Sequence, residues 1–169
     1  MKLYRFSPIQ NETQLMKAIE YIHSTCHVLC KQSMRKYLPI AGNIGVFCHY
    51  DGEYTFLTKL QAELTDTSMS VYGKYFRLYK PIVIPAKNDI PKTTYTYLYI
   101  RKPDLSKHQV GDVDFYLEPE EYTKLKQSLI AGKIMKGTRV LPNRPDLDLI
   151  ELYDPNIDAL GYIGNKKWQ

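Results

Sequence analysis

The sequence predicts an α+β fold, in which one mixed or mainly antiparallel β-sheet packs against about three helices that lie mostly on one face. Segments rich in β-branched and aromatic residues outnumber those with helical periodicity, and the two kinds do not alternate regularly as in a parallel α/β protein. A chain of 169 residues is typical of one domain, and no repeat or linker divides it. We therefore expect a single domain over residues 1–169 that ends in a basic tail at 164–169.

The N-terminal part is expected to contain two helices and two strands. Residues 1–8 alternate well enough for a first strand. Asn11 begins a helix with a capping-box pattern, and apolar residues at helical spacing extend that helix to Leu38. Residues 44–50 form a short apolar run that is typical of a buried strand. Asp51 then suits the N-cap of a second helix.

The C-terminal part is expected to be richer in strands. Residues 74–85 are β-rich and interrupted by proline, and residues 93–102 show the clearest strand pattern in the chain. A third strand begins at Gly111. The third helix is predicted between Pro119, which suits a first turn, and Gly132, which suits a C-terminal stop. The remaining short strands are predicted at 139–142, 148–155 and 157–163.

Charge and cysteine content bound the possible partners and the compartment. A net charge of +5 permits an anionic partner without requiring one. Three cysteines cannot all pair within one chain, and no apolar run approaches the ~20 residues of a membrane span. We expect reduced thiols, a cytoplasmic location and no association with a membrane.

The stretch YIHSTCHVLC brings two histidines and two cysteines together on the first predicted helix. His23 and His27 have the four-residue spacing of a helical ligand pair, but one helix cannot surround a zinc ion with four ligands. Cys26 and Cys30 fall inside the apolar stripe of the helix. Because free cysteine is commonly buried, the stretch indicates core packing, and we expect neither a metal nor a cofactor.

Tyrosine and arginine alternate along two of the predicted strands. In a strand, alternate residues share a face. If the two strands are neighbours, one face of the sheet carries five tyrosines and two arginines: Tyr75, Arg77, Tyr79, Tyr95, Tyr97, Tyr99 and Arg101.

Aromatic rings among cations suit single-stranded nucleic acid, because the rings stack bases and the cations neutralise phosphates. The leading hypothesis is therefore a binding module for an anionic partner, with single-stranded nucleic acid or a nucleotide as ligand. Two alternatives use the same residues. Tyrosine is a favoured strand residue that can serve packing alone, and Tyr and Arg also anchor interfaces of a protein–protein adaptor or a homo-oligomer.

A different hypothesis makes the protein a small hydrolase of phosphate esters. His49, Asp51 and Glu53 lie where a predicted strand gives way to a helix, and a histidine with two carboxylates can provide acid/base chemistry or hold a divalent ion. The simpler interpretation is that Asp51 and Glu53 stabilise the helix N-terminus. His108, in a polar loop, is a further candidate for such a site.

Asp112 and Asp114 share one face of a predicted strand. Such pairs sometimes bind metals, but a solvated polar face explains them more simply. The sequence contains neither G-x-x-x-x-G-K-[ST] nor G-x-G-x-x-G nor G-x-S-x-G. This argues against a P-loop NTPase, a dinucleotide oxidoreductase of the usual type and an α/β-hydrolase.

Overall fold

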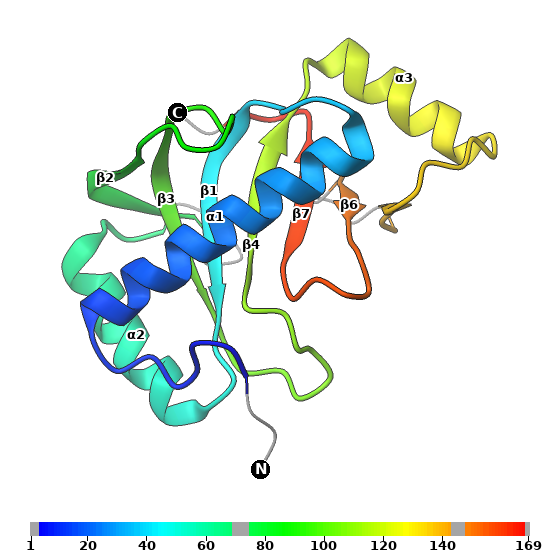
Figure 1. Ribbon diagram of the computed structural model, residues 1–169. Coiled ribbons are helices and arrows are strands. Elements are labelled where there is room, and N and C mark those ends of the chain that lie inside the picture. Colours follow the sequence, from blue (N-terminus) through cyan, green and yellow to red (C-terminus); the bar gives the residue numbers. More distant parts are fainter. Residues whose placement is uncertain (1–3, 69–74, 143–147, 168–169) are drawn as a thin grey trace.

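The computed structural model describes residues 4–68, 75–142 and 148–167 and confirms the predicted α+β class (Figure 1). Within these residues, one sheet of seven strands is accompanied by three helices. In chain order the elements are α1 (Glu12–Met34), β1 (Ile40–Phe47), α2 (Asp51–Leu64), β2 (Phe76–Ile84), β3 (Thr93–Arg101), β4 (Gly111–Tyr116), α3 (Pro119–Ile130), β5 (Thr138–Val140), β6 (Ile150–Leu152) and β7 (Leu160–Gly164).

The sheet is mixed, with the strand order β2-β3-β1-β4-β7-β6-β5. β1 pairs in parallel with β3, and β4 pairs in parallel with β7. The other neighbours are antiparallel. β2 is an edge strand, which explains why it tolerates Pro81.

Helix α1 begins where the sequence predicts and ends earlier. The side chain of Asn11 accepts a hydrogen bond from the backbone N–H of Gln14 at 2.9 Å, and Gln14 Oε1 accepts one from Gln10 N–H at 2.7 Å. The helix ends at Met34 because Arg35 adopts the left-handed conformation, with φ of 61°. The predicted extension to Leu38 is therefore wrong.

Two predicted strands are placed differently. Residues 4–8 form no strand, and the part of that prediction at 1–3 lies outside the described residues. The strand predicted at 44–50 starts at Ile40 instead and includes Gly42, whose φ of 110° coincides with a shift in the β1–β4 register. Such a bulge explains why a glycine interrupts the strand without ending it.

The tail predicted at 164–169 begins inside the sheet, because Gly164 is the last residue of β7. Residues 168–169 lie outside the described part of the chain.

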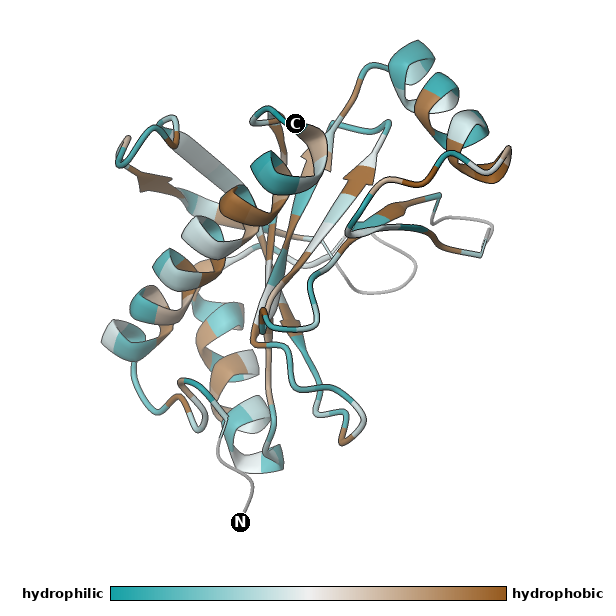
Figure 2. Ribbon diagram, turned by 45° about the vertical axis from the view of Figure 1, so that its right-hand side comes forward, coloured by the Kyte–Doolittle hydropathy of each residue, from teal (hydrophilic) through white to brown (hydrophobic). Residues whose placement is uncertain are grey.

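Helices α1 and α2 cover the same face of the sheet (Figures 1 and 2). Side chains of α1 pack on β1, β4 and β7, and α2 packs on β2 and β3, while α3 contacts β5 at the end of the sheet. The main core lies between α1, α2 and the sheet, and it includes Ile22, Ile44, Leu98, Val113 and Phe115. No helix covers the centre of the opposite face in the described parts of the chain, and we call this the open face.

Among the described residues, no helix is both long enough and apolar enough to cross a bilayer.

Candidate functional site

A row of polar side chains crosses the open face. Each strand contributes one residue to this row, and residues on neighbouring strands are paired in the sheet register. The one exception is the step from β1 to β4, where a hydrogen bond of 3.0 Å joins Asn43 and Asp114. From β2 to β5 the row consists of Arg77, Tyr97, Asn43, Asp114, Tyr162, Glu151 and Arg139. The row ends in an ion pair between Arg139 and Glu151. The open face is thus polar along its whole width.

A pocket of about 280 Å³ lies over the middle of this row. It is lined by two carboxylates, three tyrosines, one arginine, one asparagine and a few apolar side chains. The lining residues are Asn43, Phe47, Tyr75, Tyr99, Arg101, Asp112, Asp114, Leu141, Pro142, Leu149 and Tyr162. Ligand pockets typically combine apolar walls with a small number of convergent polar groups, and this pocket has that composition.

Gly45 makes room for one of the two carboxylates. A Cβ atom at position 45 would lie 2.1 Å from Asp112 Oδ1, closer than any van der Waals contact allows. Gly45 is the register partner of Asp112 on β4 and of Tyr99 on β3. The missing side chain therefore lets the Asp112 carboxylate lie across β1, where it is only 8% exposed.

Asn43 has a defined orientation. Its Nδ2 donates to Asp114 Oδ2 at 3.0 Å, and because a carboxylate only accepts, the amide nitrogen must face Asp114. The amide oxygen then points away from Asp114. Asn43 is 4% exposed, and among the described residues its Oδ1 has no hydrogen-bond partner. A buried acceptor without a partner is costly, and because this oxygen has almost no solvent-accessible surface, a donor could reach it only if its neighbours moved.

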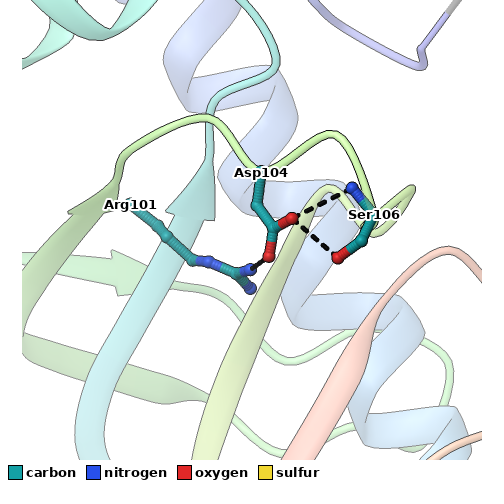
Figure 3. A network of polar contacts seen from close by, with 3 residues as sticks. All are labelled: Arg101, Asp104 and Ser106. Atoms are coloured by element: carbon teal, nitrogen blue, oxygen red, sulfur yellow. Dashed lines mark hydrogen bonds and ion pairs between the residues drawn. The ribbon is translucent and has the colours of Figure 1, made fainter.

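Arg101 lies at the rim of the pocket, and its charge is balanced locally. Its guanidinium donates to Asp104 Oδ2 at 2.9 Å (Figure 3). The guanidinium carbon also lies 4.3 Å from the centre of the Phe47 ring. The other carboxylate oxygen of Asp104 accepts hydrogen bonds from the backbone N–H and the hydroxyl of Ser106. Hydrogen bonds from Ser106 and the charge of Arg101 hold the pKa of Asp104 below its usual value, so this carboxylate is ionised at neutral pH.

The tyrosines in the pocket keep their protons. Burial raises the pKa of Tyr75, Tyr99 and Tyr162 above the usual value, and the negative charge of Asp112 raises it further for each. At neutral pH the three hydroxyls are therefore uncharged groups that can both donate and accept hydrogen bonds.

The described part of the pocket lining contains more carboxylates than cations. Among the described residues, the lining contains two carboxylates, Asp112 and Asp114, and one cation, Arg101, which is paired with Asp104. The sequence predicts a cationic aromatic face, and the described lining contains these two carboxylates in addition to Arg101 and the tyrosines.

The Tyr/Arg set predicted from the sequence is only partly brought together. Tyr75, Tyr99 and Arg101 line the pocket, and Arg77 lies opposite Tyr97 on the same face. Tyr79 is 69% exposed and does not line the pocket.

The placement of Tyr95 on that face is wrong. Its side chain is fully buried, and its hydroxyl lies 2.9 Å from His23 Nδ1 on α1. The β2–β3 register shifts between Tyr95 and Tyr97, and such an irregularity breaks the strict alternation of faces.

The residues of the predicted hydrolase site have structural contacts. The carboxylate of Glu53 is buried and accepts hydrogen bonds from two backbone N–H groups, Ile9 at 2.9 Å and His49 at 2.8 Å. His49 Nδ1 lies 2.8 Å from Ser7 Oγ, and the ring of Tyr4 stacks on the imidazole. These contacts fasten the segment before α1 to the start of α2.

The other members of that prediction are solvent-exposed. Asp51 is the first residue of α2 and does not cap it, because the N-cap residue is Tyr50 and no side chain caps the helix. His108 is exposed in the loop between β3 and β4.

The His/Cys stretch on α1 is part of the core, as predicted. His23, Cys26, His27 and Cys30 are all buried. His27 Nδ1 donates to the backbone oxygen of His23 at 2.8 Å, and burial raises the pKa of Cys30 to about 11, so its thiol stays protonated. Within the described residues, no group of three or more His, Cys, Asp or Glu side chains is arranged to hold a metal ion.

Sequence reasoning missed Asn43, Asp112, Asp114 and Tyr162 as members of one site. One available signal was Asn43 itself, a polar residue inside the otherwise apolar segment IAGNIGVF. A buried polar residue in a strand needs a partner, and the facing candidates were Asp112 and Asp114, which the simpler interpretation assigned to a solvated face.

Comparison with known proteins defines the fold alone. No protein-family model matches the chain, and no curated protein matches it. One similar solved structure, described as "Structural Genomics, Protein EC4020", is 12% identical, with 98% of this chain and 94% of that chain covered and a TM-score of 0.59. At this identity the likeness concerns the arrangement of helices and strands.

Weaker matches come from methylmalonyl-CoA epimerases. The Streptomyces coelicolor enzyme in complex with 2-nitronate-propionyl-CoA is 16% identical over 78% of this chain and 99% of that chain, with a TM-score of 0.35. A methylmalonyl-CoA epimerase in complex with methylmalonyl-CoA is 17% identical over 75% and 95% of the two chains, with a TM-score of 0.33. Superpositions this loose carry no inference about the present chain.

Proposed function

We propose that the protein binds a small polar molecule in the pocket on its open face. The observation that carries this proposal is the group of polar side chains, Asn43, Asp112 and Asp114, which converge at the base of a pocket in the middle of the sheet. Placing carboxylates and an amide in partly desolvated positions costs free energy, which a ligand that hydrogen-bonds to them offsets.

The volume of the pocket sets the size of the ligand. A pocket of about 280 Å³ lies at the lower end of the range for small-molecule sites, which is roughly 300–1,000 Å³. It suits a compact metabolite and is too small to enclose an oligonucleotide.

The anionic partner predicted from the sequence remains a prediction for the remainder of the open face. Arg77 and Tyr97 lie beside the pocket, and Tyr79 is exposed on the same edge strand as Arg77. Among the described residues outside the pocket, these offer a combination of cation and rings of the kind that single-stranded nucleic acid requires. The hydrolase hypothesis gains no support from the contacts of His49 and Glu53.

The test is an NMR titration of the ¹⁵N-labelled full chain. The side-chain amide signals of Asn43 report directly on the pocket, and we expect compact polar metabolites to shift them together with backbone signals of β1, β4 and β7. A hexanucleotide provides the comparison. Perturbation by the hexanucleotide alone, centred on Arg77 and Tyr97, would show that the function lies outside the pocket.

A further inference from the structure

We infer that a second pocket, between α1 and the connection from β2 to β3, binds a small apolar molecule through an uncharged carbonyl oxygen. In this arrangement the Nε2–H group of His23 donates a hydrogen bond to the carbonyl. The pocket has a volume of about 420 Å³ and is lined by α1 residues between Glu20 and Val28 and by residues of the segment 84–90. It shares no described lining residue with the pocket on the open face, so the two sites are independent.

His23 is the buried polar group of this second pocket. The residue is only 2% exposed, and its Nδ1 lies 2.9 Å from the hydroxyl oxygen of Tyr95. In the described parts of the chain, Nε2 forms no hydrogen bond, yet it is not among the unpartnered polar atoms that the fold encloses completely. The remaining accessible area of His23 therefore includes Nε2, and since His23 lines the pocket, a group in the pocket can reach this atom.

The contact with Tyr95 determines which ring nitrogen of His23 carries the proton. Burial raises the pKa of Tyr95, so its hydroxyl keeps its hydrogen at neutral pH. This buried hydroxyl needs an acceptor, and Nδ1 of His23 lies within hydrogen-bond distance, so Tyr95 donates to Nδ1. Burial lowers the pKa of His23 to about 4, so the ring is neutral at pH 7. A neutral imidazole that accepts at Nδ1 carries its hydrogen on Nε2, and the pocket is therefore offered a donor.

Apolar side chains form much of the wall around this donor. They come from α1 and from the segment 84–90, and they include Val28, Ile84, Pro85 and Ile90. Val28 is 42% exposed, so apolar surface is available to a ligand. Small-molecule sites typically have volumes of roughly 300–1,000 Å³ and combine apolar walls with a few polar groups. The walls thus favour an apolar body, and Nε2–H favours an acceptor.

The charges at the pocket favour an uncharged acceptor. Among the described lining residues, Glu20 and Lys87 are charged, both are exposed at the rim, and their charges are opposite. Neither the rim nor the neutral ring of His23 supplies a net positive charge that would offset the cost of removing a carboxylate from water. An alkylammonium group has donors alone and cannot accept from Nε2–H. A ketone, ester or amide oxygen meets both conditions.

The experiment compares three probes that share a six-membered ring. These are cyclohexanone, cyclohexylamine and cyclohexanecarboxylate, which are neutral, cationic and anionic at pH 7. Each is titrated into the ¹⁵N-labelled full chain while the two ring nitrogens of His23 are followed by NMR. We expect the free chain to show the hydrogen on Nε2. We expect cyclohexanone to shift the Nε2 signal and to bind at least tenfold more tightly than either charged probe.

A variant that fills the pocket tests its position without touching His23. Ala86 is exposed and lines the pocket, so Ala86→Trp places a large ring in it, and we expect the affinity for cyclohexanone to fall at least tenfold. Ala62→Trp, the same change at an exposed position of α2, is the matched control and should leave the affinity unchanged. His23→Phe removes the donor and should also weaken binding at least tenfold. If that variant unfolds because Tyr95 loses its acceptor, Ala86→Trp still gives the result.

Several outcomes would overturn the inferred site. These are a hydrogen on Nδ1 in the free chain, equal or tighter binding of a charged probe, no shift at His23 with any probe, and undiminished affinity in Ala86→Trp. None of them bears on the pocket of the open face, which is followed through the signals of Asn43.

Discussion

Substituting Gly45 by alanine tests whether the Asp112 carboxylate lies where the structure places it. The new Cβ would lie 2.1 Å from Asp112 Oδ1 and 3.0 Å from Asp112 Cγ, so the oxygen must retreat by more than about 1 Å to reach an ordinary contact. The backbone of Gly45 does not require glycine for its conformation, so the effect of the substitution is steric. Overpacking of this kind costs about 1–3 kcal/mol.

Part of that cost is recovered. Alanine is favoured over glycine inside a strand by roughly 0.5–1 kcal/mol. We therefore expect Gly45→Ala to lower the free energy of unfolding by about 1 kcal/mol, which for a chain of this size shifts the Tm by roughly 2–4 °C. We also expect the affinity for a ligand in the pocket to fall, because the displaced carboxylate of Asp112 no longer lies at the base of the pocket.

Urea unfolding gives the stability, and the titration with compact polar metabolites, followed at the Asn43 side-chain amide, gives the affinity. The control is Gly52→Ala in the first turn of α2, where a Cβ would meet nothing within 4 Å. That variant should be as stable as the wild type or slightly more stable, with unchanged affinity. The reasoning is refuted if Gly45→Ala binds the same metabolites as tightly as the wild type does and unfolds at the same urea concentration.

Two further predictions concern the packing around the sheet. Glu53→Gln replaces one acceptor of a backbone N–H by an amide nitrogen, and since hydrogen bonds to a charged group contribute about 1.5–3 kcal/mol, we expect a loss of similar size in urea unfolding. Glu63→Gln should change stability by less than about 0.5 kcal/mol, and equal values for the two variants would contradict the proposed attachment of the N-terminal segment. Burial, with a smaller effect of His27, lowers the pKa of His23 from 6.5 to about 4. The unfolded chain therefore binds the proton more readily than the folded chain. The contribution of neutral His23 to the free energy of unfolding is complete above about pH 6.5 and is lost as the pH falls toward 4. Urea midpoints between pH 7 and 4.5 should fall more steeply for the wild type than for His23→Asn, and parallel profiles would contradict this assignment.

Local patterns were sufficient for the class of fold and for most elements. The alternation in residues 93–102 predicted β3, and Pro119 and Gly132 bracketed α3 closely. The end of α1 was not predictable in this way, because Arg35 adopts a left-handed conformation that residues other than glycine rarely take.

Features that depend on pairing between distant segments could not be predicted from the sequence. Tyr95 was assigned to the open face by strict alternation, but the register shift between β2 and β3 turns it toward His23. The pocket depends on β1 lying beside β4, which brings Asn43 to Asp114 across 71 positions of sequence. Alternation within one strand contains no information about which strand lies next to it.

The outer edge of β2 bears on how two copies of this chain could meet. Thr65 forms a bridge to Leu78, the backbone N–H of Asp66 donates to the Arg77 carbonyl at 2.8 Å, and Pro81 has no N–H to offer. A strand from a second copy could therefore not pair with the whole edge of β2, because Thr65 and Asp66 already pair with one end and the backbone of Pro81 has no hydrogen-bond donor. Self-association by continuing the sheet past β2 is therefore disfavoured, so a homodimer would have to form through another part of the surface.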